Sequence, residues 1–172
     1  MISDLTIEDL TIEHQDHEQP IVRFSTYQKF GFQRKAFNDK SCLVRHAAYE
    51  ALGFEKETKN DEYDKIRLGF YKTFGFTNEA LVDESASVRL AAYKALGFTE
   101  NAFEDDDVDI RHEAYKVLGF TRKALKDDCG VLRRDAEQYF ERCRVILDNE
   151  DTKYEFSEYE ADLIRFNGLP VL

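Results

Sequence analysis

Residues 86–98 read ASVRLAAYKALGF, and a version of this pattern returns every 22 residues along most of the chain. From residue 21 the consecutive blocks are IVRFSTYQKFGFQRKAFNDKSC, LVRHAAYEALGFEKETKNDEYD, KIRLGFYKTFGFTNEALVDESA, SVRLAAYKALGFTENAFEDDDV and DIRHEAYKVLGFTRKALKDDCG, followed by VLRRDAEQYF. The blocks align without a gap. Because a repeat of roughly 20 to 50 residues is the signature of solenoids and repeat arrays, this register decides the fold.

The first half of each block predicts an amphipathic helix. In the fourth block, Val88, Ala92, Ala95 and Leu96 have helical spacing and form one apolar stripe. Residues suited to helix starts precede the blocks: Ser41, Ser85 and Asp107 stand three residues before the Val or Ile as N-caps, and Pro20 occupies a first-turn position.

The second half of each block predicts a shorter helix. Gly97 stands where a left-handed residue ends a helix, and Phe98 after it can fold back on the last turn. Thr99 can cap a second helix with Ala102 and Phe103 as its apolar contacts. Two such contacts are enough for one or two turns only, so we expect a short α or 3₁₀ helix.

A unit of this size cannot bury its apolar stripe alone, so consecutive units must stack. We predict an all-α fold, a right-handed α-α superhelix (α-solenoid) of about five and a half repeats. Residues 21–130 are five 22-residue repeats and residues 131–172 are C-terminal capping helices, one over 131–147 and one from a Ser157/Glu160 capping box to Ile164. Residues 1–20 are an acidic N-terminal segment that either docks as a cap or forms a mobile arm for a basic partner.

The pattern D-x-x-x-x-VR-x-x-AY-x-ALGF resembles HEAT-type repeats over residues 21 to about 140. The unit is about half as long as a HEAT repeat and is closer to the bacterial leucine-rich repeat variant, in which α and 3₁₀ helices alternate. The resemblance implies α-helices on the inner surface, and binding or scaffolding more often than catalysis.

An aspartate precedes the arginine of the next block by six residues in every repeat. The pairs are Asp39 and Arg45, Asp61 and Arg67, Asp83 and Arg89, Asp105 and Arg111, and Asp127 and Arg133. We predict a structural ladder in which a charge-assisted hydrogen bond ties each inter-repeat loop to the next helix. An arginine ladder that binds phosphates or carboxylates is the alternative, weakened by the carboxylate near each guanidinium.

A helical wheel places an unexpectedly apolar row on the side that should face water. The row is Phe24, His46, Leu68, Leu90 and His112, and the tyrosines at its edge are Tyr49, Tyr71, Tyr93 and Tyr115. A contiguous apolar row on a monomer marks a contact surface, so we predict a protein- or peptide-binding groove there. The alternatives are that the stack or a terminal cap covers the row and that the tyrosines are packing residues.

The second block is irregular, because Thr58 and Lys59 replace the alanine and the leucine or phenylalanine of the other short helices. We expect this short helix to lose its anchor, with Phe70 filling the gap and Gly69 making room. Either a hinge for partner-induced fit or a loose loop at residues 55–64 would result.

The charge of −11 is concentrated at the two ends of the chain. Residues 1–20 contain six acids and no Lys or Arg, and residues 148–162 contain seven acids and Lys153, whereas residues 21–147 are balanced. Direct nucleic-acid binding is unfavoured because phosphate recognition needs a basic face. The absence of a signal peptide or membrane span and three unpatterned cysteines predict a cytoplasmic protein with reduced thiols.

Catalytic and cofactor motifs are missing from the sequence. No nucleotide-binding, zinc-protease or nucleophile-elbow string occurs, so we expect neither an enzyme nor a cofactor. His14 and His17 have a spacing that can chelate a metal, but a polar chain end explains them better, and we predict no metal site. The leading hypothesis is a non-catalytic protein-binding scaffold, and the alternative is an acidic, nucleic-acid-mimicking inhibitor of a basic enzyme of the phage or mobile-element type. A third hypothesis, a lyase or glycosylase on the same scaffold, is disfavoured because the sequence offers no catalytic site for it.

Overall fold

The computed structural model describes residues 6–148, with side chains as far as residue 143, and every regular element in this range is a helix. The α-helices are α1 (Pro20–Phe30), α2 (Cys42–Leu52), α3 (Asp64–Phe74), α4 (Ala86–Leu96), α5 (Val108–Leu118) and α6 (Gly130–Asp148). The 3₁₀ helices are η1 (Ile7–Asp9), η2 (Ile12–Asp16), η3 (Arg34–Asn38), η4 (Lys56–Asn60), η5 (Asn78–Val82), η6 (Glu100–Glu104) and η7 (Ala124–Lys126). The predicted all-α repeat fold, with one α-helix and one short helix per block, is confirmed.

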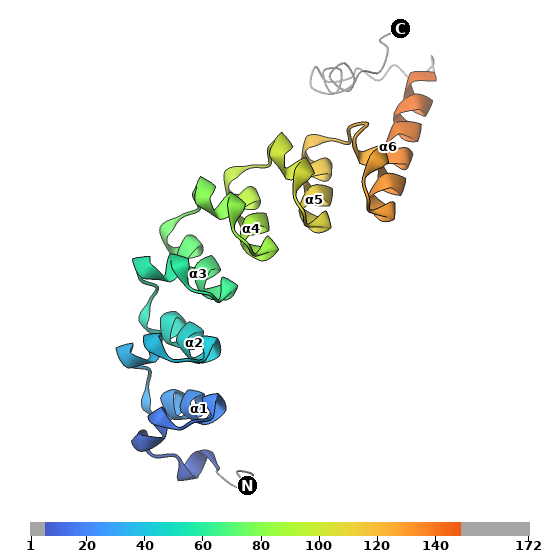
Figure 1. Ribbon diagram of the computed structural model, residues 1–172. Helices are drawn as coiled ribbons and strands as arrows, with labels where there is room; N and C mark the ends of the chain where they lie inside the picture. Colours follow the sequence, from blue (N-terminus) through green and yellow to red (C-terminus); the bar gives the residue numbers. More distant parts are fainter. Residues whose placement is uncertain (1–5, 149–172) are drawn as a thin grey trace. The chain divides into compact units, whose positions relative to one another are not determined.

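The chain divides into two compact units, Met1–Ala95 and Leu96–Leu172. Within the first unit, α1 packs against α2 and α2 against α3, while η2, η3 and η4 pack against the α-helices that follow them. Figure 1 shows the α-helices of this unit side by side along one edge, with the 3₁₀ helices and loops along the other. Successive repeats therefore bury their apolar sides against their neighbours.

The core of the first unit forms between consecutive helices. Tyr27, Ala36, Val44 and Ala48 form one cluster across α1, η3 and α2, and the equivalent cluster across α3, η5 and α4 contains Tyr71, Ala80, Val88 and Ala92. The alanines of η3, η5, η6 and η7 are fully buried, namely Ala36, Ala80, Ala102 and Ala124. In both clusters, a residue of the short helix thus packs between two consecutive α-helices.

Aromatic stacking completes each junction. Tyr49 lies between Phe37 of η3, at 4.2 Å between ring centroids, and Phe54, at 5.8 Å, with all three rings nearly parallel. Phe54 follows the glycine that ends α2, so it folds back on the last turn as predicted. Phe32 and Phe76 stack on Tyr27 and Tyr71 in the same way.

The glycines that end the helices have a backbone conformation that only glycine adopts readily. Gly75 has φ +97° and ψ 147°, and its N–H donates to the carbonyl of Tyr71. The positive φ was predicted, but the ψ lies far from the left-handed helical value. The chain therefore leaves α3 extended and reaches η5 within three residues.

The prediction that the short helix of the second block loses its anchor is wrong. η4 forms over Lys56–Asn60, and Thr58, 2% exposed, takes the place of the buried alanine and donates to the carbonyl of Glu55 at 2.5 Å. Gly69 makes room for Phe54 and not for Phe70, because a Cβ at Gly69 would lie 2.1 Å from the Phe54 ring. Phe70 instead packs against Tyr71 and Phe74 of its own helix.

The segment before the first repeat lies on α1. The Nζ of Lys29 donates to the carbonyls of Ile7, Glu8 and Leu10, each at 3.0 Å, and Leu10 is buried. Of the two expectations for residues 1–20, docking therefore describes residues 6–17. Residues 1–5 lie outside the described range.

The second unit repeats this arrangement around α5. Tyr115 lies between Phe103 of η6 and Phe120, with ring centroids 4.3 and 5.5 Å away. α6 is longer than the other α-helices and buries Leu132 and Ala136. The second predicted capping helix, at 157–164, lies outside the described residues.

Candidate functional site

The regularly spaced arginines and aspartates form a buried ion pair at each junction of the first unit. Arg67 donates through Nε to Asp83 Oδ2 at 2.8 Å and through Nη2 to Oδ1 at 2.7 Å. The same two-pronged contact joins Arg23 to Asp39 and Arg45 to Asp61, and in the second unit Arg111 to Asp127. In these four pairs the carboxylate binds the arginine sixteen residues before it, and not the arginine six residues after it as predicted.

The arginine that follows each aspartate contacts the backbone instead. Arg67 Nη1 donates to the carbonyls of Asp61 and Glu62, at 2.8 and 3.1 Å. Equivalent bonds run from Arg45 to Asp39, from Arg89 to Asp83, from Arg111 to Asp105 and from Arg133 to Asp127. Each of these guanidinium groups thus donates hydrogen bonds to the carbonyls that precede its helix. In the four pairs above, the guanidinium also donates to the carboxylate that follows the helix.

The aspartates also start the next helix. Asp83 Oδ1 accepts a hydrogen bond from the backbone N–H of Ser85 at 2.8 Å, and the side chains of Arg67 and Asp83 are only 7% and 8% exposed. Burial alone would raise the pKa of the Asp83 carboxyl, but the hydrogen bonds from Arg67 and Ser85 outweigh burial and the pKa is lowered. The hydrogen bond from Arg111 lowers the pKa of Asp127 from 3.8 to about 2.

The tyrosines predicted at the groove edge lie in the core. Tyr49, Tyr71, Tyr93 and Tyr115 are between 1% and 8% exposed. Burial raises the pKa of Tyr49, Tyr71 and Tyr115, as expected for phenols removed from water. The structure therefore places these four residues away from any open surface.

The predicted apolar row is half-buried. Phe24 packs against the Tyr27 cluster and Leu68 against the Tyr71 cluster, and Leu90 is also half-buried. His112 belongs to the second unit, where its Nε2 lies 2.9 Å from Asp135 Oδ2. Of the row, the structure brings Phe24 and His46 together in one hollow.

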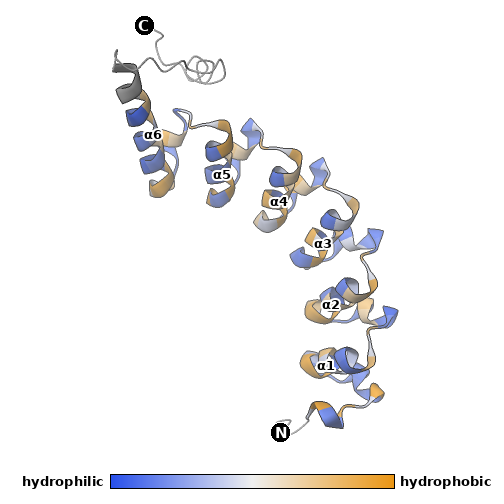
Figure 2. Cartoon of the chain, turned by 180° about the vertical axis from the view of Figure 1, so that it is seen from behind, coloured by the Kyte–Doolittle hydropathy of each residue, from blue (hydrophilic) through white to orange (hydrophobic). Residues whose placement is uncertain are grey.

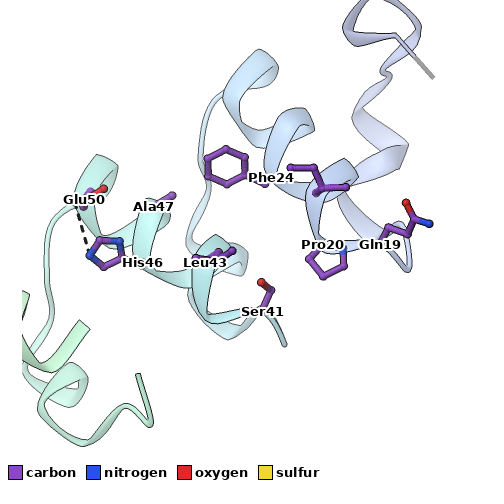
Figure 3. Close-up of a pocket in the computed structure, with 9 residues that line it drawn as sticks. Gln19, Pro20, Phe24, Ser41, Leu43, His46, Ala47 and Glu50 are labelled. Carbon is purple, nitrogen blue, oxygen red and sulfur yellow. Dashed lines mark ion pairs between the residues drawn. The ribbon is translucent and has the colours of Figure 1, made fainter. Parts of the chain in front are cut away.

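That hollow is the α1–α2 groove, with a volume of about 620 Å³ (Figure 3). Its lining residues are Gln19, Pro20, Ile21, Phe24, Ser41, Leu43, His46, Ala47 and Glu50. Ile21 is 65% exposed and Leu43 60% exposed, so two large aliphatic side chains face water beside Phe24. Exposed apolar side chains gathered in a concavity are the usual character of a binding site.

Sequence reasoning missed Ile21 and Leu43, although a signal was present. The same position of the repeat is Lys65, Ser87 and Asp109 in the next three blocks, as suits a solvent-facing site. An aliphatic residue there in the first two blocks marks a local departure from the repeat. Figure 2 shows apolar segments along α1 and α2 in the ribbon coloured by hydropathy.

The polar groups of the groove lie at its two ends. Glu50 is the single acid of the lining, its side chain is 63% exposed, and its Oε1 lies 3.7 Å from His46 Nε2 (Figure 3). Gln19 and Ser41, which precede α1 and α2, lie at the other end, and neither side chain caps its helix. Apolar contact therefore dominates the middle, with polar atoms only at the rims.

The two N-terminal histidines have structural partners. His14 Nδ1 accepts a hydrogen bond from the backbone N–H of Thr11 at 3.0 Å, and His17 Nδ1 accepts one from that of Gln19 at 3.1 Å. Within residues 6–148 no group of three or more metal-ligating side chains gathers. The three cysteines, Cys42, Cys129 and Cys143, are free.

No helix in the described part of the chain is long and apolar enough to cross a bilayer. Comparison of the chain with protein-family models, with curated proteins and with solved structures gave no match. The α1–α2 groove and its surroundings are therefore the features of the molecule that bear on its function.

Proposed function

We propose that the protein is a non-catalytic repeat scaffold that binds a protein or peptide partner in the α1–α2 groove. The observation that carries the proposal is the exposure of Ile21 and Leu43 beside Phe24 in a hollow of about 620 Å³. Burial of these side chains by a partner would remove apolar area from water, at about 25 cal/mol per Å². The middle of the groove is apolar, as suits the side chains of a peptide.

The junction between α1 and α2 supports this use because it is held rigidly. Arg23 pairs with Asp39 at 2.6 Å, and Arg45 donates to the carbonyl of Asp39 at 2.9 Å. Both ion-paired side chains are about one-tenth exposed or less. A groove whose walls are fixed in advance loses less conformational entropy when a partner binds.

Selection of displayed random peptides on the full chain tests the proposal. Peptides recovered on the wild type should lose binding to the Leu43→Asp variant, because a carboxylate would be buried without a partner. They should keep binding to Val82→Asp, since Val82 is 82% exposed on η5 and lies outside the groove. Failure to recover peptides, or equal binding to both variants, would contradict the proposal. Leu68→Asp is a poorer test because Leu68 packs against the core.

The acidic-inhibitor hypothesis stays a prediction. The acidic residues on which this hypothesis depends are concentrated in residues 1–20 and 148–162, and residues 149–162 lie outside the described range. No feature of the described residues favours it over the groove.

A further inference from the structure

The outer surface of α3 and α4, next to the groove, is basic. Lys65, Lys72 and Lys94 are exposed, and Lys72 and Lys94 occupy the repeat position that is Glu50 in α2. The two helices contain one acid, Asp64, and its carboxylate accepts hydrogen bonds from Ser85 and Ser87 at 2.8 and 3.1 Å. Asp64 keeps its negative charge, because its pKa is lowered by these hydrogen bonds, so the three lysines outnumber the one carboxylate on these helices.

The acids of the first unit lie instead on its other edge. Exposed glutamates occur in the 3₁₀ helices and loops, namely Glu57, Glu62, Glu79 and Glu84. Along α1 to α4 the single exposed acid is Glu50. The helical edge is therefore locally positive although the whole chain has a charge of −11.

The apolar groove and the lysines form one continuous strip. α2 packs against α3, so the groove ends where the α3 lysines begin, and Figure 1 shows α1, α2, α3 and α4 in sequence along the same edge. Lys29 of α1 is already engaged with the N-terminal carbonyls. The strip thus changes from apolar at α1 and α2 to basic at α3 and α4.

We propose that the strip recognises a peptide segment of a partner protein in which large apolar residues are followed by acidic residues. The apolar side chains occupy the α1–α2 groove, and the carboxylates pair with Lys65, Lys72 and Lys94. The inference rests on the proposed function and names the chemistry of the partner. The strip should bind an acidic segment in preference to a basic one, because the lysines attract carboxylates and repel basic side chains.

The same peptide selection tests the inference with one further pair of variants. Peptides enriched on the wild type should contain a large apolar residue and at least two acids. Their binding to Lys65→Glu/Lys72→Glu should weaken by about tenfold, because exposed ion pairs are modest and charge reversal adds repulsion. The matched control is Lys40→Glu/Lys56→Glu, which makes the same charge change on the other edge of the unit and should leave binding unchanged.

Three outcomes would overturn the inference. If Leu43-dependent peptides carry no acids and bind both lysine variants equally, the partner chemistry is wrong while the proposed function stands. If no Leu43-dependent peptide is recovered, both are wrong. If sedimentation shows self-association of the wild type that Leu43→Asp abolishes, the occupant is a second copy of the chain. Circular dichroism of every variant should match the wild type, since each changed side chain is exposed.

Discussion

The guanidinium of Arg67 joins three successive segments of the chain. It donates to the carbonyls of Asp61 and Glu62 before α3, belongs to α3 itself, and pairs with the carboxylate of Asp83 after η5. Both charged side chains are nearly inaccessible to water, so loss of one removes the buried counter-ion of the other. Removal of one partner of a buried pair is far more costly than removal of an exposed one.

Asp83→Ala should therefore destabilise the protein by about 3 kcal/mol, because the buried guanidinium of Arg67 loses its buried carboxylate partner and keeps only the exposed Glu84 as a counter-ion. Glu84→Ala is the matched control, since Glu84 also contacts Arg67, at 3.1 Å, but its side chain is 79% exposed. That change should cost about 0.5 kcal/mol or less. Urea unfolding of the three proteins measures both values, and equal losses would show that burial of the pair is unimportant.

The same aspartates predict how stability depends on pH. The pKa values of Asp39, Asp61 and Asp83 are lowered in the folded protein, and that of Asp127 falls to about 2. A lowered folded pKa contributes stability that is complete above the unfolded value and disappears as pH falls through the folded value. The urea midpoint should decline between about pH 4 and about pH 2. Asp127→Asn should show a shallower decline, and an unchanged slope would contradict the assignment.

At the scale of elements, the surface of α3 is fitted to a side chain that follows α2, the ring of Phe54. Gly69 lies in the middle of α3, where glycine ordinarily lowers helix stability. The ring of Phe54, which stacks on Tyr49 of α2, occupies the space that a side chain at Gly69 would need. The α2–α3 junction thus depends on one missing side chain.

Gly69→Ala should cost about 1–3 kcal/mol, despite the better helix propensity of alanine, because the new methyl would overlap the Phe54 ring. Phe54→Leu shortens the side chain and should make the same Gly69→Ala change less costly. A double-mutant cycle in thermal or urea unfolding measures the coupling. Additive effects of the two changes would show that the ring and the methyl do not meet.

Element boundaries could be predicted from sequence because each repeat carries its own start and end residues. The ion-pair partners could not be predicted from the sequence. Each aspartate lies sixteen residues after one arginine and six residues before the next, and because the two separations add up to the 22-residue period, either pairing gives the same sequence pattern. The tyrosines were placed at the edge because a wheel of one helix ignores the rings that arrive from elsewhere, such as Phe37 on Tyr49. Only part of the groove was predicted: Phe24 and His46 lie in it. Ile21 and Leu43 depart from the polar residues that the next three blocks have at the same position, but a wheel of one helix does not show that two helices bring them together.

At the scale of the whole molecule, the decisive property is that within each of the two units the stabilising contacts join neighbouring repeats. Every bond of the Arg67 guanidinium falls within 17 residues of it along the chain. Stability of such arrays is close to a sum over repeats and their nearest-neighbour interfaces. Removal of one complete repeat should therefore be tolerated, whereas removal of part of one should not.

Deletion of residues 64–85 joins Tyr63 to Ala86 and leaves the register intact, because Arg89 takes the position of Arg67. The shortened chain should fold, with a smaller denaturant m value in proportion to the surface lost. Deletion of residues 64–74 alone removes α3 and should abolish cooperative unfolding of the first unit. Circular dichroism and urea titration compare the two, and equal behaviour would contradict a modular array.

The sixteen-residue reach of the Arg23–Asp39 and Arg45–Asp61 pairs also bears on synthesis. A nascent chain leaves the ribosome from its N-terminus, so Arg23 waits only until Asp39 has emerged before its junction can close. The junction of Arg45 can close in the same way once Asp61 has been synthesised. Each of these two junctions can thus close soon after its repeat has been synthesised, because neither Arg23 nor Arg45 pairs with a carboxylate made much later.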